Sequence, residues 1–251
     1  MGPSTAAGDN ALVGRRVVVT GASSGIGEST VRQCTALGAR VAAVARRGER
    51  LQQLADELGI VPVVVDLATP GGSATAVATA AKGLGGIDIL INNAGVYLLG
   101  GLADGRPADW RRMFDLNVLS VLEMSQAALP YLRESHCGHI VNVSSVGGRR
   151  VARTSTAVYS ATKFALNAIS EGMRQELHPK GVRVSVVSPG VVRTELGVGT
   201  ADEELLAQLQ AKQAAMGIGP DAVARAIAYV LSEPPEVAVY EMVVMPTAQP
   251  G

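Results

Sequence analysis

The 251-residue sequence has little cysteine, no excess of one charge and no long apolar run. Its two cysteines, Cys34 and Cys137, are isolated, so their spacing matches neither a metal site nor a disulfide framework. We expect both thiols to be reduced. Because residues 1–14 lack the pattern of a secretory signal, we expect a cytoplasmic protein.

Charge and hydropathy argue against two classes of partner. The 22 basic residues balance the 22 acidic ones, so neither nucleic acid nor an anionic membrane is expected as the main partner. Hydrophobic residues make up 47% of the chain, yet every apolar run falls short of the roughly 18 residues that a transmembrane helix requires.

Runs of β-branched residues alternate with helical patterns along the chain, which is typical of a parallel sheet covered by helices on both faces. We predict a flexible tail at 1–13 and a single Rossmann-type, doubly wound α/β domain at 14–251, with a mainly parallel seven-stranded sheet. The predicted strands are 16–20, 40–45, 61–65, 87–91, 139–144, 182–187 and 239–245. The predicted helices are 25–37, 48–58, 70–84, 107–133 with a break near 113, 158–178, 202–214 and 220–232.

The first predicted strand runs directly into TGASSGIG, residues 20–27, which opens the first predicted helix. Glycines let the backbone turn tightly and approach a pyrophosphate at a helix N-terminus, where the helix dipole favours anions. An ordinary strand-to-helix turn is the alternative, but the position between strand and helix favours nucleotide binding. The expected cofactor contacts in this turn are Gly21, Ser23, Ser24, Gly25, Ile26 and Gly27.

The second predicted strand ends in two arginines, where an acidic side chain would bind a free ribose 2′-hydroxyl. Arg46 and Arg47 therefore predict NADP(H), with Arg46 favoured as the 2′-phosphate ligand. The alternative is a solvated pair of cations at a helix start, although cations are unfavourable there. After the third strand, Asp66 and Leu67 are placed to meet the adenine, and Asp66 could equally cap a helix.

A tyrosine and a lysine four residues apart lie on one face of the predicted helix 158–178. A cation near Tyr159 would favour the phenolate, so Lys163 could bring the pKa of the phenol toward the working range. Tyr159 could then exchange a proton with a substrate oxygen. By itself the pair could also be a surface tyrosine with a nearby lysine.

Six motifs occur in a characteristic order: TGASSGIG, NNAG at 92–95, LNV containing Asn117, NVSS containing Ser144 and Ser145, YSATK at 159–163, and PG at 189–190 followed by Thr194. With these motifs the chain resembles the short-chain dehydrogenase/reductase family over nearly its full length. It is most similar to an NADP-dependent subgroup that includes clavulanic acid dehydrogenase and bacterial serine and 3-hydroxy acid dehydrogenases. That resemblance implies a homotetramer packed through helices near 113–133 and 158–178.

The resemblance also implies roles for individual residues. Tyr159 would be the acid/base, with Lys163, Ser145 and Asn117 as its partners. Ser145 lies one residue farther from Tyr159 than is usual in the family, which we interpret as an insertion in the intervening loop, and Ser144 is the alternative. Asn117 would hold a water that links Lys163 to solvent, unless it only caps or kinks its helix. The implied cofactor contacts are Asn93, Ala94, Gly95, Tyr159, Lys163, Pro189, Gly190, Val192 and Thr194.

The substrate end should follow the carboxyl ends of the strands. Arg149, Arg150 and Arg153 bring three cations close to the predicted serine, either to anchor a carboxylate or phosphate or as part of a solvated loop or subunit contact. The segment at about 191–217 resembles the family's mobile substrate lid, whose apolar positions are Leu205, Leu206, Leu209 and Met216.

The favoured function is NADPH-dependent reduction of a small aldehyde or ketone, and an anionic substrate is one option. The alternatives are an NADP-dependent 3-hydroxy acid or serine-type dehydrogenase and a non-catalytic NADP-sensing protein. In each case no metal ion is expected.

Overall fold

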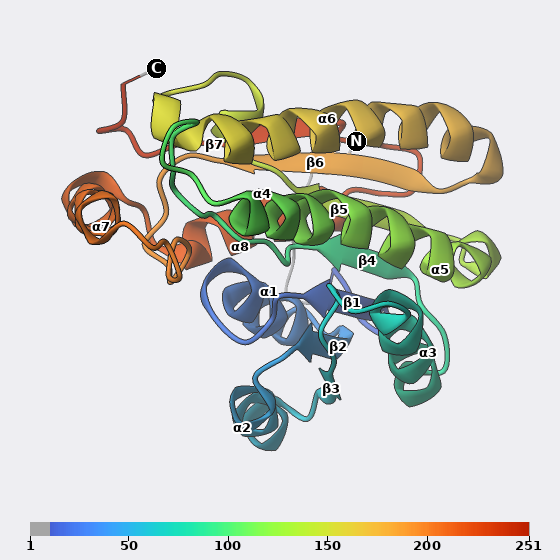
Figure 1. The fold of residues 1–251 in the computed structure, drawn as a ribbon. Coiled ribbons are helices and arrows are strands. Elements are labelled where there is room, and N and C mark those ends of the chain that lie inside the picture. Colours follow the sequence, from blue (N-terminus) through green and yellow to red (C-terminus); the bar gives the residue numbers. More distant parts are fainter. Residues whose placement is uncertain (1–10, 251) are drawn as a thin grey trace.

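The structure, a computed structural model, describes residues 11–250. Residues 1–10, most of the expected tail at 1–13, therefore lie outside the described residues. Seven parallel strands form one sheet in the order β3-β2-β1-β4-β5-β6-β7 (Figure 1). The prediction of a mainly parallel doubly wound sheet is confirmed, and all of its pairings are parallel. The strands are β1 (Arg16–Thr20), β2 (Arg40–Ala45), β3 (Val61–Val64), β4 (Ile89–Asn92), β5 (His139–Val143), β6 (Arg183–Pro189) and β7 (Glu241–Val244).

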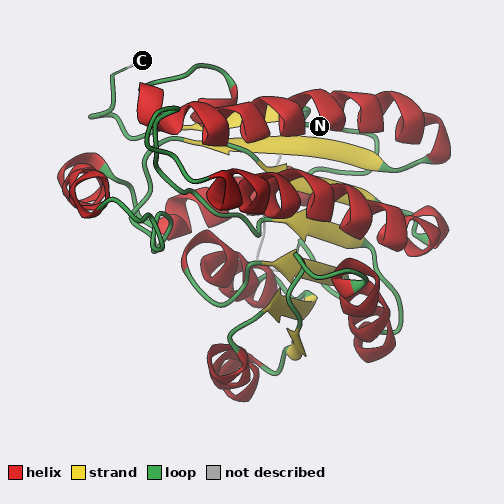
Figure 2. Ribbon diagram, viewed as in Figure 1, coloured by secondary structure: helices red, strands yellow, loops and turns green. Residues whose placement is uncertain are grey.

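Helices cover both faces of the sheet (Figure 2). Successive side chains of a strand point to opposite faces, so apolar residues on both faces need helices to bury them. In β1, Val17 and Val19 pack into one core with α1 and α8, whereas Val18 packs into the other core with α3 and α5. Each fully buried side chain of this size contributes about 1.5–3 kcal/mol. The helices are α1 (Gly25–Ala36), α2 (Gly48–Leu58), α3 (Gly72–Leu84), α4 (Pro107–Phe114), α5 (Ser120–Glu134), α6 (Ala157–Leu177), α7 (Glu203–Met216) and α8 (Pro220–Ser232).

The expected break in the long helix at 107–133 is a π-helical turn, η1 (Asp115–Leu119), between α4 and α5. The wider turn brings Asn117 against the loop that follows β4, where its side chain is fully buried. Such turns often mark functional sites. Figure 1 shows α5 and α6 lying side by side over the same face of the sheet.

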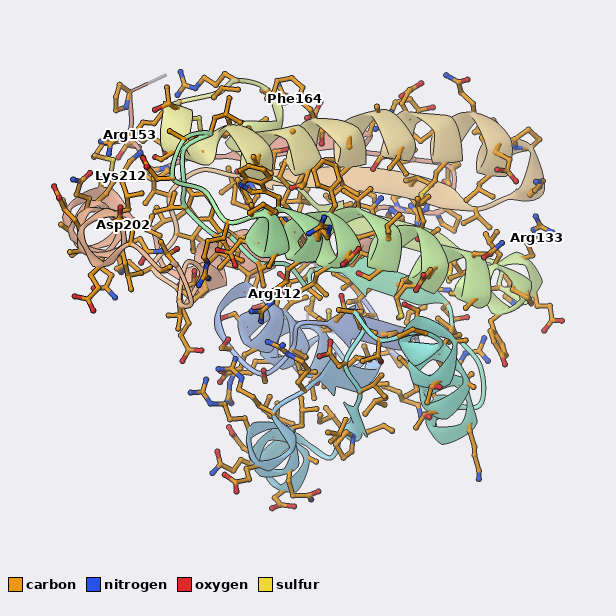
Figure 3. The ribbon with its side chains drawn as sticks, in the orientation of Figure 1. Arg112, Arg133, Arg153, Phe164, Asp202 and Lys212 are labelled. Carbon is orange, nitrogen blue, oxygen red and sulfur yellow. The ribbon has the colours of Figure 1, made fainter. Side chains whose placement is uncertain are left out.

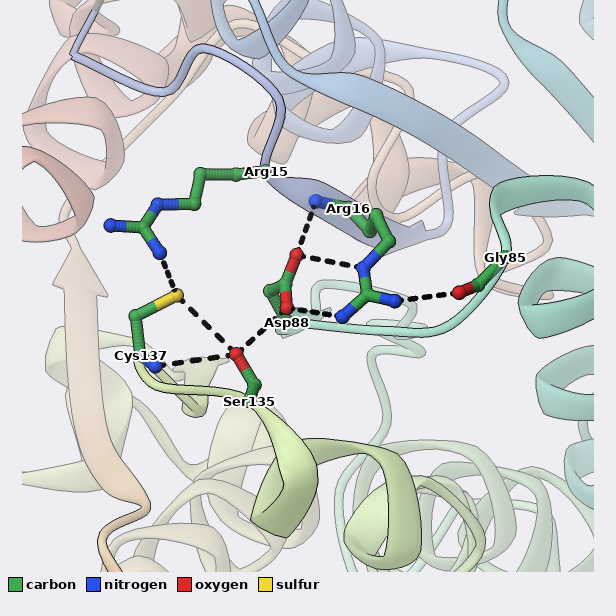
Figure 4. Close-up of polar contacts among 6 residues, drawn as sticks. All are labelled: Arg15, Arg16, Gly85, Asp88, Ser135 and Cys137. Carbon is green, nitrogen blue, oxygen red and sulfur yellow. Dashed lines mark hydrogen bonds and ion pairs between the residues drawn. The ribbon is translucent and has the colours of Figure 1, made fainter.

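A charged cluster ties the amino-terminal end of β1 to the residues around β4 and to the end of α5 (Figure 4). Asp88 accepts hydrogen bonds from the Arg16 backbone nitrogen at 2.8 Å, from Arg16 Nε at 2.9 Å and from the Ser135 hydroxyl at 2.7 Å. Burial alone would raise the pKa of Asp88, but these hydrogen bonds outweigh it and lower the pKa to about 2. The cluster therefore fixes the register of β1 against β4 at the end opposite the cavity.

The strand order reverses between β1 and β4, because the chain leads outward to β2 and β3 on one side and to β5, β6 and β7 on the other. Ligands of open α/β sheets bind at the carboxyl ends of the strands beside such a switch point. No helix within residues 11–250 combines the length and the apolar character needed to cross a membrane.

Candidate active site

A cavity of about 950 Å³ opens at the carboxyl ends of the strands. Its volume lies in the range of small-molecule and cofactor sites. Of the predicted site residues, all but Gly27 and Asn117 line it. Those that do are Gly21, Ser23, Ser24, Gly25, Ile26, Arg46, Arg47, Asp66, Leu67, Asn93, Ala94, Gly95, Ser145, Tyr159, Lys163, Pro189, Gly190, Val192 and Thr194.

The turn between β1 and α1 depends on its glycines. Gly21 and Gly25 have φ angles of +65° and +57°, which other residues rarely adopt. A Cβ on Gly27 would collide with the Gly21 carbonyl oxygen and lie 2.5 Å from Asn93 Nδ2. Gly27 therefore packs the turn against the loop after β4, which explains why it does not line the cavity.

Asn93 connects this turn to β4. Its side-chain amide donates to the Thr20 carbonyl oxygen at 2.9 Å, and its backbone nitrogen donates to Thr20 Oγ1 at 3.0 Å. Ala94 also donates its backbone N–H to Thr20 Oγ1, at 2.9 Å. The Thr20 hydroxyl thus holds two successive residues of the loop beside the glycine turn, on the wall of the cavity.

The two arginines after β2 face different partners. Arg46 lies 3.7 Å from an Asp66 carboxylate oxygen, with about half of its side chain exposed. Arg47 donates through Nε to the Ser23 hydroxyl at 2.9 Å and through Nη2 to the Ser24 hydroxyl at 2.6 Å. Asp66 accepts from the Ala68 backbone N–H at 3.0 Å and does not cap α3, because Gly71 is at that N-cap.

Tyr159 lies at the first turn of α6 with only 8% of its surface exposed. Its ring packs on that of Tyr97, with centroids 4.3 Å apart and the planes tilted by 54°. Burial raises the pKa of Tyr159, a hydrogen bond with Ser145 opposes that rise, and Tyr97 adds to it. The phenol is therefore protonated throughout the neutral range.

Lys163 is one helical turn farther along α6 and is 5% exposed. Its ammonium donates to the Val143 carbonyl oxygen at 2.9 Å and lies 5.9 Å from the centre of the Tyr159 ring. Burial lowers the pKa of Lys163 to about 8. Burial is the largest cause of the pKa shift at both groups, so in the protein alone the pKa of Tyr159 stays above its usual value although Lys163 is near.

The Asn117 side chain contacts both the loop after β4 and helix α6. Its Oδ1 accepts from the Val96 backbone N–H at 2.8 Å, and its Nδ2 donates to the Val96 carbonyl oxygen at 2.9 Å and to Thr162 Oγ1 at 3.1 Å. Both polar atoms of the side chain are thus engaged. Asn117 fastens the loop after β4 to α6 next to Lys163, instead of lining the cavity.

The choice between the two serines after β5 follows from their surroundings. Ser145 accepts from the Gly147 backbone N–H at 3.0 Å, and a Cβ on Gly147 would lie 3.4 Å from both Ser145 Oγ and a Tyr159 ring carbon. Among the described residues, the buried Ser144 hydroxyl has no hydrogen-bond partner. This geometry favours Ser145 as the partner of Tyr159.

The three arginines that follow β5 have different surroundings in the structure. Arg150 and Arg153 line the cavity, whereas Arg149 turns away from it and pairs with Glu241 at 2.6 Å. Lys212 of α7 also lines the cavity and was missed by sequence reasoning. Helical spacing could have found it, since Lys212 follows the predicted lid residues Leu205 and Leu209 on one face.

Lys212 and Arg153 project from different elements at the same end of the molecule (Figure 3). Burial lowers the pKa of Lys212, and the charges of Arg153 and Arg150 lower it further. Tyr97 also lines the cavity and is a second residue that was not singled out from the sequence. Of the predicted apolar lid positions, Leu205, Leu209 and Met216 line the cavity and Leu206 does not.

The fold and the site together define a doubly wound α/β domain in which a nucleotide-type glycine turn and a buried tyrosine share one cavity. Comparison with known proteins agrees with this class. A family model described as short chain dehydrogenase matches residues 15–230. The chain is an oxidoreductase of the short-chain dehydrogenase family.

Relatives in sequence and structure cover nearly the whole chain. An uncharacterized oxidoreductase of Staphylococcus saprophyticus is 39% identical over 238 residues, covering 93% of this chain and 96% of that protein. One from Staphylococcus aureus is 35% identical over 240 residues, covering 94% and 98%. Serine dehydrogenase complexed with NADP+ matches with a TM-score of 0.86 at 32% identity, covering 94% and 96%. A short chain dehydrogenase from Burkholderia cenocepacia in complex with NADP has a TM-score of 0.82 at 31% identity, covering 94% and 98%.

Proposed function

We propose that the protein is an NADPH-dependent oxidoreductase that reduces a small aldehyde or ketone to an alcohol, reversibly, with Tyr159 as the proton donor. The observation that carries this proposal is that Tyr159, Ser145 and Lys163 line the same cavity as the glycine turn after β1. The structural relatives complexed with NADP support the cofactor assignment.

The residues present fit NADP(H). The first-turn N–H groups of α1 have no intrahelical acceptor, and the Ser24 side chain makes no capping hydrogen bond. A pyrophosphate can therefore accept from these groups at the positive end of the helix. Arg46 and Arg47, on the wall of the cavity next to β2, would hold a 2′-phosphate. When bound, the cofactor supplies the hydride.

The chain's own residues then control the carbonyl oxygen. As charge develops on that oxygen, the protonated Tyr159 donates its proton and the Ser145 hydroxyl donates a second hydrogen bond. Lys163 supplies a positive charge beside the phenol, which stabilises the phenolate left after proton transfer. Asn117 positions the loop at Val96 that walls this space.

A further part of the proposal concerns the substrate. Arg150, Arg153 and Lys212 line the cavity, and Arg153 donates to Gln208 on α7 at 3.4 Å. Like charges that converge on one cavity favour an anionic ligand. This observation favours a carboxylate-bearing carbonyl substrate and supports a hydroxy acid dehydrogenase as the second candidate function.

We extend the proposal to the lid and to assembly. Helix α7 has no fully buried residue, which is the loose packing expected of a segment that moves over substrate. On α4, α5 and α6 together with η1, Phe114, Leu119, Leu122 and Phe164 are between 38% and 49% exposed. These apolar side chains support a homotetramer assembled through those helices.

The proposed function is tested by following NADPH absorbance with a panel of aldehydes, ketones and hydroxy acids, with NADH as the comparison. We expect turnover with NADPH and small carbonyl compounds. Arg46→Ala should weaken NADPH binding by about tenfold, since a charge-assisted contact is lost, and should leave NADH binding unchanged. Equal turnover with NADH, or no effect of Arg46→Ala, contradicts the cofactor assignment.

The substrate class has its own matched control. Arg153→Gln and Lys212→Gln should each raise KM for a carboxylate-bearing substrate by about tenfold, with little change for an uncharged one. Arg149→Gln removes a cation four residues from Arg153 that lies outside the cavity, and should change neither KM. If all three variants behave alike, the anion site is refuted.

A further inference from the structure

A carboxylate from the segment after β6 pairs with two arginines that follow β2, at the wall of the cavity. Glu195 lies 2.5 Å from Arg47 Nη1 and 2.9 Å from Arg50 Nη1. Glu195 and Arg47 both line the cavity. This bridge joins the root of the proposed lid to the start of α2, across 148 positions of the chain.

The bridge occupies a site for an anion. Arg47 bonds Glu195 through one guanidinium nitrogen while its other two nitrogens donate to the Ser23 and Ser24 hydroxyls of the glycine turn. The guanidinium is therefore held in one orientation, with Nη1 directed at the carboxylate. Hydrogen bonds from Arg47 and then Arg50 lower the pKa of Glu195 to about 2, so the carboxylate is charged at every physiological pH.

Carboxylate and phosphate groups compete for the same guanidinium donors. Arg46 is not engaged by Glu195 and has only a longer contact, to Asp66 at 3.7 Å. An incoming 2′-phosphate would thus find Arg46 available and Arg47 occupied. A ribose with a free 2′-hydroxyl has no charge with which to displace the carboxylate.

We propose that Glu195, in the cofactor-free protein, occupies the Arg47 donor that the 2′-phosphate of NADP(H) uses, and thereby moderates the preference for NADP(H) over NAD(H). Binding of NADP(H) displaces Glu195 from Arg47 and releases the root of the 191–217 segment from the glycine turn. Binding of NAD(H) leaves the bridge in place. This inference rests on the NADP(H) site of the proposed function.

The test compares Glu195→Gln with wild type by calorimetry at physiological salt, where charges farther away than about 8 Å are largely screened. The probes are NADPH, NADH, adenosine 2′,5′-bisphosphate and adenosine 5′-monophosphate. Because an exposed ion pair contributes about 0.2–1 kcal/mol, Glu195→Gln should tighten the binding of NADPH and of the bisphosphate by about 1.4- to 5-fold. NADH and the monophosphate should bind as they do to wild type.

A matched control is available on α2. Glu57 pairs with Arg32 at 2.5 Å, is comparably exposed, and does not line the cavity. Glu57→Gln should leave all four affinities unchanged. In an Arg47→Gln background, Glu195→Gln should no longer tighten NADPH, because the donor for which the two anions compete is gone.

Two results would overturn the inference. Weaker or unchanged NADPH binding in Glu195→Gln would mean that no competition exists at Arg47. Equal tightening of NADPH and NADH binding would mean that the substitution acts through the overall charge of the site and not through competition at Arg47. Failure of wild type to bind NADPH and the bisphosphate at all would instead refute the cofactor site of the proposed function, so the two failures can be told apart.

Discussion

Replacing Lys163 by methionine should stabilise the cofactor-free protein while abolishing its activity. Lys163 is 5% exposed, and its ammonium makes one hydrogen bond, to the Val143 carbonyl oxygen, among the described residues. Burial lowers its pKa from 10.5 to about 8, and at 1.36 kcal/mol per pKa unit the buried charge costs about 3 kcal/mol. Charged groups placed at functional sites commonly reduce stability in this way.

The net effect of the substitution is smaller than that cost. Methionine has a similar length and no charge, but it forgoes the hydrogen bond to Val143, which contributes about 1 kcal/mol. We therefore expect a gain of about 2 kcal/mol at neutral pH, which corresponds to a rise in Tm of about 4–8 °C for a chain of this size. Urea unfolding and calorimetry of the cofactor-free proteins measure it.

The gain should also depend on pH with a defined sign. Because the folded pKa lies below the unfolded one, the charge destabilises the fold fully below a pH of about 8, and this penalty disappears as pH rises toward about 10.5. The difference between Lys163→Met and wild type should therefore shrink over that interval. Lys180→Met, at an exposed lysine paired with Glu176, should change stability by no more than about 0.5 kcal/mol. A lower Tm in Lys163→Met would refute the desolvation argument.

Three further predictions concern the fold, the serines and the assembly. Asp88→Asn should destabilise the protein by about 2 kcal/mol at neutral pH, since the pKa of Asp88 is lowered from 3.8 to about 2. In acid unfolding, the stability difference between wild type and variant should fade as pH falls from about 4 to about 2. A difference that is undiminished at a pH of about 2 would contradict this prediction. Ser145→Ala should reduce kcat about a hundredfold. Ser144→Ala removes a hydroxyl without a partner among the described residues and should leave kcat within about twofold of wild type. If steady-state kinetics show the reverse, Ser144 is the partner of Tyr159. Phe164→Asp, on the exposed face of α6, should lower the mass measured by light scattering without loss of fold, and an unchanged mass would exclude that face from the interface.

Much of the fold could be predicted because glycines and prolines in the sequence mark the ends of its helices and strands. Glycine and proline bound most strands and helices, so predicted and observed limits agree within about three residues. The predicted helix at 70–84 begins later, at Gly72, because Gly71 adopts a left-handed conformation at its N-cap. The break expected near residue 113 is a π-helical turn at 115–119, a distinction that depends on backbone hydrogen bonding and leaves no reliable mark in residue types.

The residues that form the site could be predicted from the sequence, but the pKa shifts of those residues could not. Motif spacing brought Tyr159, Ser145 and Lys163 together, yet the acceptor of the Lys163 ammonium, a carbonyl oxygen at the end of β5, could not be read from side-chain identities. Burial also raises the pKa of the phenol, an effect that the motif spacing does not reveal. Arg149 and Arg153 are alike in sequence, and only the path of the loop turns one toward Glu241 and the other toward the cavity.

The central claim is that Tyr159 donates the proton in an NADPH-dependent carbonyl reduction. The most direct measurement is single-turnover oxidation of bound NADPH by Tyr159→Phe, beside the affinity of the same variant for NADPH. Loss of general acid catalysis should slow turnover by about 10²–10⁴-fold, while NADPH affinity remains within about threefold of wild type. Turnover at the wild-type rate with cofactor binding intact would contradict the assignment.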